Sequence, residues 1–133
     1  MVFDIKNLIK DAQGIRLLYV EDNEEAREAT YALLSNIFSN IIVAVDGKDG
    51  LEKFQTQEKV HLVLTDINMP LMDGVEMAHR IKKIDKEVKI FFLSADDTMK
   101  DICEYDCKDI KLSKPFDVKI FAKKFAQIRA DFE

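Results

Sequence analysis

Short apolar runs of strand length recur along the chain, separated by longer and more polar stretches. The runs around Leu62 and Ile90 are almost continuously apolar, which is typical of parallel strands that are covered on both faces. The pattern therefore predicts a sheet of five buried, parallel strands. These strands are expected at residues 15–20, 41–45, 60–65, 88–93 and, more weakly, 109–113.

Apolar residues in the intervening stretches recur three and four positions apart, as they do in amphipathic helices. A predicted helix thus follows each predicted strand. Such alternation is typical of an α/β fold in which a doubly wound, five-stranded parallel sheet carries helices on both faces. The helical stretches are expected at residues 26–37, 51–54, 75–81, 98–106 (the weakest) and 116–133.

Length and composition favour a single domain. The chain has 133 residues, of which 47% are hydrophobic and 34% charged, and its net charge of -5 argues against direct binding to nucleic acid or an anionic membrane. No apolar run approaches the ~18 residues of a membrane span, so a cytoplasmic protein is expected. Cys103 and Cys107 are expected to be reduced thiols rather than a disulfide framework or a metal site.

Polar residues of complementary chemistry follow four of the predicted strands. Glu21 and Asp22 follow the first strand and Asp66 the third, whereas Ser94 follows the fourth and Lys114 the fifth. In an open parallel sheet, ligands bind beyond the carboxyl ends of the strands. These five side chains are therefore expected to converge on one edge of the sheet.

Carboxylates that converge in this way repel one another, by about 4 kcal/mol for a pair about 4 Å apart at an effective dielectric constant of about 20. A hard divalent cation such as Mg²⁺ would offset that repulsion. Lys114 suits one phosphate oxygen and Ser94 can donate a hydrogen bond to another. A carboxylate can itself be the nucleophile and form an acyl phosphate. The set therefore indicates phosphoryl chemistry.

The same residues, with their neighbours, resemble the receiver domain of bacterial two-component response regulators, a CheY-like superfamily. The resemblance runs from about Ile15 to the end of the chain and implies a flavodoxin-like sheet of strand order 2-1-3-4-5. It leaves residues 1–14 as an N-terminal extension, either a short helix or a frayed end. The matching motifs are Glu21-Asp22, Asp66, Met69-Pro-Leu-Met-Asp-Gly74, Leu93-Ser-Ala95 and Ser113-Lys-Pro-Phe116.

The resemblance also implies roles for the site residues. Asp66 would accept a phosphoryl group from a histidine kinase or histidine phosphotransfer protein. Mg²⁺ (or Mn²⁺) would be bound directly by Asp22, Asp66 and the backbone carbonyl of Asn68, and through a water by Glu21. Ser94 and Lys114 would contact the phosphoryl oxygens. The domain would catalyse only its own phosphorylation and hydrolysis, and would signal to a downstream protein or an output domain outside this chain.

Some residues fit plainer roles or depart from the family pattern. Asp22 and Asp73 also suit helix capping, the preferred interpretation for Asp73. Glu21 replaces the more frequent Asp, and Lys111 stands where receivers often carry an aromatic residue that swings inward on activation. The segment between Ser94 and Lys114 is also about two residues shorter than the family pattern, with no Gly-Ala turn.

Three alternatives share parts of this pattern. One is a receiver-like binding module that acts independently of phosphorylation. Another is an aspartate-nucleophile phosphatase of the haloacid dehalogenase type, which would place Asp-x-Asp after the first strand and needs a longer chain. The third is a flavodoxin-type flavin binder, which would need a Ser/Thr/Gly-rich phosphate loop where this chain has Glu21-Asp22-Asn23.

Overall fold

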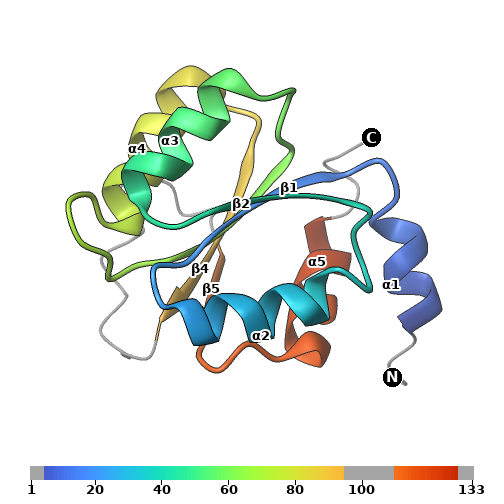
Figure 1. Ribbon diagram of the computed structural model, residues 1–133. Coiled ribbons are helices and arrows are strands. Elements are labelled where there is room, and N and C mark those ends of the chain that lie inside the picture. The colour runs from blue at the N-terminus through green and yellow to red at the C-terminus, as the bar shows by residue number, and fades with distance from the viewer. Residues whose placement is uncertain (1–4, 95–109, 129–133) are drawn as a thin grey trace.

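Five parallel strands form the centre of the molecule in a computed structural model that describes residues 5–94 and 110–128. The sheet order is β2-β1-β3-β4-β5, which confirms the predicted topology (Figure 1). Each strand lies within one or two residues of its predicted run. The strands are β1 (Arg16–Val20), β2 (Asn40–Ala44), β3 (Leu62–Asp66), β4 (Lys89–Ser94) and β5 (Ile110–Ser113).

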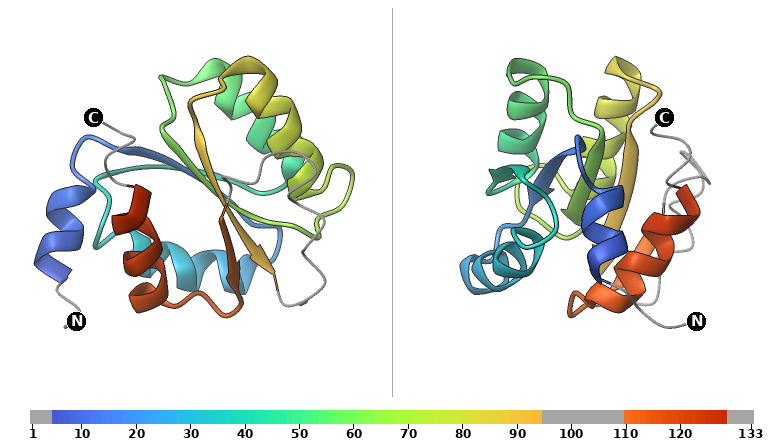
Figure 2. Two further views of the ribbon diagram at one scale, coloured as in Figure 1. Left: turned by 180° about the vertical axis from the view of Figure 1, so that it is seen from behind. Right: turned by 90° about the vertical axis from the view of Figure 1, so that its right-hand side faces the viewer.

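Helices cover both faces of the sheet, as predicted. Figure 2 shows α3 and α4 on one side of the strands and α1, α2 and α5 on the other. The helix predicted at 98–106 lies outside the described residues, as do Cys103 and Cys107. The described helices are α1 (Ile5–Asp11), α2 (Glu24–Leu34), α3 (Gly47–Thr56), α4 (Gly74–Ile84) and α5 (Val118–Ile128). None of these helices is long and apolar enough to cross a membrane.

Alternation along the buried strands divides the core into two clusters. On β1, Leu17 and Tyr19 belong to the cluster under α1, α2 and α5, whereas Leu18 and Val20 belong to the cluster under α3 and α4. This division follows from the two-residue period of a strand. The residue that follows Val20, Glu21, therefore continues the first face just beyond the carboxyl end of the sheet.

Side-chain caps fix where three helices begin. Asn23 Oδ1 accepts a hydrogen bond from the Ala26 amide at 2.9 Å, and Asp46 Oδ1 accepts one from the Asp49 amide at 2.7 Å. Asp73 Oδ1 accepts from the Glu76 amide at 2.8 Å, which confirms its predicted capping role. The N-cap of α2 is Asn23 and not Asp22. The Asp22 carboxylate is therefore not used to cap this helix.

The N-terminal extension forms a helix that closes one end of the core. Leu8 is 4% exposed and Ala12 is 1% exposed, and both pack in the same cluster as Phe38 and Phe125. In Figure 2, α1 lies beside α5, on the face of the sheet that the two helices share. Residues 5–12 are therefore part of the packed domain.

Truncation of Leu8 should consequently destabilise the whole domain. We expect Leu8→Ala to lower the free energy of unfolding by about 2 kcal/mol, because it removes a buried side chain and leaves a cavity. Ile9→Ala, on the exposed side of the same helix, is the control and should change it by less than about 0.5 kcal/mol. Urea denaturation measures both, and equal effects would show that α1 does not pack as described.

Candidate functional site

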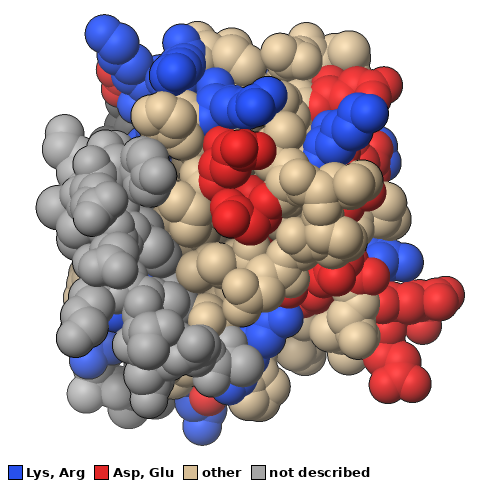
Figure 3. All heavy atoms as spheres, turned by 90° about the vertical axis from the view of Figure 1, so that its left-hand side faces the viewer, with Lys and Arg blue, Asp and Glu red and all other residues tan. Residues whose placement is uncertain are grey.

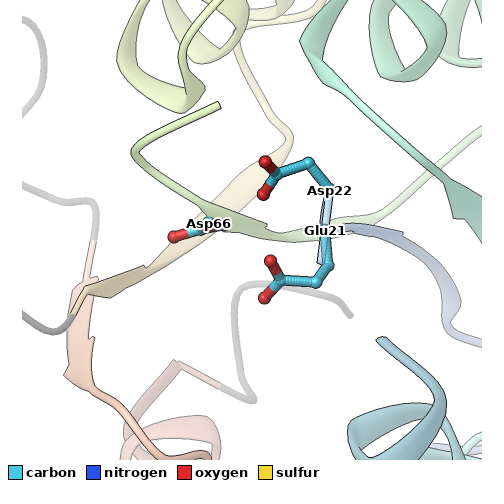
Figure 4. A group of neighbouring side chains, drawn as sticks. All are labelled: Glu21, Asp22 and Asp66. Carbon is cyan, nitrogen blue, oxygen red and sulfur yellow. The ribbon is translucent and has the colours of Figure 1, made fainter. Parts of the chain in front are cut away.

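Three carboxylates meet at the carboxyl edge of the sheet. Glu21 and Asp22 follow β1, Asp66 ends the neighbouring strand β3, and one ligand oxygen from each lies within 4.8 Å of the others. Figure 4 shows Glu21 and Asp22 extending from the end of β1 toward the side on which Asp66 lies. Glu21 is 1% exposed and Asp66 6% exposed, whereas Asp22 is exposed. Two of the three acids are therefore nearly buried and the third faces solvent, and we call this site of Glu21, Asp22 and Asp66 the acidic recess.

Lys114 joins two of these acids. Its Nζ lies 3.1 Å from Glu21 Oε1 and 3.2 Å from Asp66 Oδ2. The Lys114 amide donates a hydrogen bond to the Ser94 carbonyl at 2.9 Å, which continues the β4–β5 pairing past the last strand residues. The pairing thus sets where the Lys114 backbone lies, and the side chain reaches back across the sheet edge to the carboxylates.

The pKa shifts report the crowding of charge. Burial raises the pKa of Glu21, the Asp66 charge raises it further, and hydrogen bonds from Lys114 and the Asn23 amide only partly oppose these effects. Burial alone would lower the pKa of Lys114, but its hydrogen bonds and attraction to Glu21 and Asp66 outweigh that and raise it. The negative charge of the site therefore exceeds the positive charge of its one ammonium. The carboxylate oxygens suit a divalent cation.

The backbone around Asp66 is held from several directions. The Thr65 hydroxyl donates to the Asp66 carbonyl at 2.8 Å, and the Ile67 amide donates to Asp66 Oδ1 at 2.9 Å. Gly74, which begins α4, packs so closely against the Asp66 carbonyl that a Cβ there would overlap it. Sequence reasoning missed Thr65 and this contact of Gly74, because neither depends on a recognisable chemical pattern.

Arg27 is a second missed residue at this edge. Its guanidinium Nη1 donates to the Glu21 carbonyl at 3.0 Å, which ties α2 to the end of β1. The sequence gives no sign of this contact, because an arginine in a helix is usually an exposed, solvated residue.

Two other predicted site residues, Ser94 and Asn68, lie at the same edge of the sheet. Ser94 ends β4, is 4% exposed, and is brought beside β3 by the pairing of the two strands. Asn68 lies two residues beyond Asp66 in the exposed part of the loop to α4. Lys111, in β5, is exposed, and the shortened segment that precedes it falls outside the described residues.

Comparison with known proteins agrees with this geometry. Residues 17–125 match the family model of the response regulator receiver domain. The chain is 34% identical over 106 residues to the response regulator receiver protein CpdR of Brucella abortus, an alignment that covers 78% of this chain and 88% of CpdR. It is 40% identical over 81 residues to the transcriptional regulatory protein DltR of Streptococcus agalactiae, which covers 61% of this chain but only 36% of DltR.

A solved structure shares both the fold and part of the sequence. The N-terminal domain of a Wolinella succinogenes protein, WS1339, superposes with a TM-score of 0.75 and 29% identity. The match covers 90% of this chain and all of that domain. The α/β architecture is therefore that of a known group of domains.

Lys114 should be most important for stability near neutral pH. Lys114→Met leaves two buried carboxylates without their cation, and we expect the free energy of unfolding to fall by about 1–3 kcal/mol at pH 7. The loss should shrink as the pH falls, because the pKa of Glu21 is already raised and its protonation removes the uncompensated charge. Lys111→Met removes an equal charge from an exposed position and should have little effect at either pH. Chemical denaturation at several pH values measures the difference, and a loss that is independent of pH would contradict the charge-balancing role.

Proposed function

Because the chain belongs to the response regulator receiver domain family, we propose that it is a phosphoaccepting signalling switch in which Asp66 is the phosphorylated residue. The observation that carries this proposal is the environment of Asp66. Its recessed carboxylate is bonded to Lys114 and lies among two further carboxylates. The Lys114 ammonium therefore lies beside the Asp66 carboxylate, and the other two acids can help to hold a metal ion.

The transfer needs few protein groups. One Asp66 carboxylate oxygen forms the new O–P bond while the N–P bond of a phosphohistidine breaks, the bonding electrons stay on the imidazole nitrogen, and that nitrogen takes up a proton. Lys114 neutralises charge on the phosphoryl oxygens, and Ser94 donates a hydrogen bond to one of them. Positioning and charge neutralisation account for most catalysis of phosphoryl transfer, so no dedicated base is required.

The acidic recess fits Mg²⁺, or Mn²⁺ in its place. Asp22, Asp66 and the backbone carbonyl of Asn68 would hold the ion directly, and Glu21 would hold it through a water. The bound ion would neutralise the charge that develops on the phosphoryl oxygens. Glu21 suits an indirect role because it is buried and already pairs with Lys114, whereas Asp22 is exposed at the open side of the recess.

The phosphorylated state is the signal. Phosphorylation gives Asp66 a charge of roughly -2, by analogy with other phosphoresidues. Ser94 and Lys114 would then turn toward the phosphoryl oxygens and change the surface beyond β4 and β5. With Lys111 exposed in β5, an inward-swinging aromatic residue does not operate at that position. The signal would pass to another protein or to an output domain.

The phosphatase and flavin-binding alternatives are not supported by the family match, which leaves a binding module independent of phosphorylation as the second hypothesis. The domain would not act on an external substrate beyond its donor. A cytoplasmic location, the histidine kinase and the downstream partner remain predictions. DltR is a transcriptional regulator by name, and because this chain spans only 36% of it, that activity is not carried over.

Phosphorylation of Asp66 can be tested with a small donor. Incubation with acetyl phosphate and Mg²⁺ should add one phosphoryl group to the wild-type chain, seen by intact mass as an acid-stable, base-labile adduct. Asp66→Asn should abolish it, because the carboxylate nucleophile is removed. Asp73→Asn is the matched control, since Asn also caps α4 well. An adduct on Asp66→Asn, or none on the wild type, would reject phosphorylation at Asp66.

Metal binding should stabilise the domain and depend on pH. At a Mg²⁺ concentration of about one hundred times the Kd, we expect a gain of about 2.7 kcal/mol in the free energy of unfolding at neutral pH. The gain should shrink on acidification, because protons compete with the ion for the carboxylates and the raised pKa of Glu21 lets its protonation begin at a higher pH than usual. Asp22→Asn should remove most of the gain. Glu52→Gln, on the exposed side of α3, is the control and should leave the gain unchanged. Thermal unfolding measures this, and stabilisation that survives Asp22→Asn would place the ion elsewhere.

A further inference from the structure

The most exposed large apolar side chain in the described part of the chain lies on the loop between Asp66 and α4. Leu71 is 87% exposed, and the next, Ile84, is 52% exposed. Single exposed apolar residues are normal on protein surfaces. Leu71 differs from the others because its backbone is also unusual.

Leu71 is held in a conformation that side chains other than glycine rarely adopt. Its φ is 70°, in the left-handed region. The loop around it is braced by hydrogen bonds from the Met72 amide to the Pro70 carbonyl and from the Gly74 amide to the Ile67 carbonyl, both 2.8 Å. The fold therefore presents this apolar side chain to solvent on a fixed backbone.

A neighbouring helix reinforces the loop. Gly47, at the start of α3, packs so closely against the Met72 carbonyl that a Cβ there would overlap it. Met69, on the other side of Leu71, is 9% exposed and packs in the core cluster under α3 and α4. The residues that flank Leu71 are thus fixed in place while its own side chain points away from the protein.

The loop that carries Leu71 begins directly after Asp66 and ends beside it. It leaves the sheet at Ile67 and reaches α4 at Gly74, which lies against the Asp66 carbonyl. It projects from the carboxyl edge of the sheet at the left of Figure 1. The Asp66 side chain is only 8% exposed. A donor protein must therefore bring its phosphoryl group into the recess and, in doing so, cover the surrounding rim.

Charge on this face indicates the chemistry of the donor. Figure 3 looks onto this edge and shows acidic side chains gathered on one side, where α2 lies. Glu24, Glu25 and Glu28 of α2 are all exposed. A protein that brings an anionic phosphoryl group to such a face needs basic side chains opposite α2.

We propose that Leu71 is an apolar anchor for the protein that phosphorylates Asp66. That protein carries a phosphohistidine beside an apolar hollow that receives Leu71, and basic side chains that face the start of α2. The inference rests on the proposed phosphorylation of Asp66 and adds the contact that selects a protein donor over a small one. The fixed backbone favours this role, because a side chain that is already ordered loses less freedom on binding.

The experiment compares two donors that share the same N–P chemistry. One is phosphoramidate, which has no protein surface, and the other is a set of autophosphorylated histidine kinases from the same genome. Leu71→Ala and Leu71→Asn remove the apolar side chain, and Asn tolerates the left-handed backbone. Leu71→Met keeps an apolar side chain of similar size. Ile84→Ala is the matched control, since Ile84 is exposed at the far end of α4, about 15 Å along the helix from Gly74.

With phosphoramidate, all variants should be phosphorylated within about twofold of the wild-type rate. With the fastest kinase, Leu71→Ala and Leu71→Asn should each slow transfer at least tenfold, equivalent to about 1.4 kcal/mol. Leu71→Met and Ile84→Ala should remain near wild type. Added NaCl should slow transfer from the kinase more than transfer from phosphoramidate, because it screens the charges on the two surfaces.

If Leu71→Ala and Leu71→Asn slow phosphorylation equally with both donors, the anchor role is rejected, since Leu71 would then act on the reaction site itself. An unchanged kinase rate in the two variants, or no transfer to the wild type from any kinase of the set, would also overturn it. A kinase rate insensitive to salt would reject the basic partner surface. If the wild type accepts no phosphoryl group from phosphoramidate, the proposed function itself fails.

Discussion

Repulsion among three carboxylates is the constraint on which the carboxyl edge of the sheet depends. Glu21 and Asp66 are nearly buried, where a charge is costly unless it is paired. Among the described residues, the pairing comes from Lys114, which lies within salt-bridge distance of both acids. One ammonium pairs with two buried carboxylates, and Asp22 adds a third negative charge. The unphosphorylated site therefore keeps a net negative charge. That surplus of negative charge favours the binding of a cation.

The fold creates this surplus by ordinary means. Parallel strands end at one edge, so residues at or just beyond the ends of β1, β3 and β5 are brought together although they are far apart in the sequence. The helices on both faces bury the strands. Close contacts then fix the details, as when Gly74 lies against the Asp66 carbonyl and Arg27 bonds to the Glu21 carbonyl. A side chain at position 74 would push apart the backbone that carries Asp66.

Much of this could be predicted from the sequence, because alternation of apolar runs and helical stripes depends only on local periodicity. The grouping of Glu21, Asp22, Asp66 and Lys114 also followed, since the strand ends share one edge. The pairing of Lys114 with Glu21 could not, because it depends on distances set by tertiary packing. The N-terminal helix was ambiguous for a related reason: seven residues are too few for a stable isolated helix, and the burial of Leu8 decides its structure.

The same ion pairs indicate how the proposed phosphorylation would change the structure beyond the site. At rest, Lys114 is divided between Glu21 and Asp66. An added phosphoryl charge on Asp66 would draw the ammonium away from Glu21, whose raised pKa already reports a poorly compensated carboxylate. The Lys114 amide is bonded to the Ser94 carbonyl, so a shift of the lysine acts on the ends of β4 and β5 together. Lys111 of β5 stands where receivers often carry an aromatic residue, and a change driven by Lys114 requires no aromatic residue there.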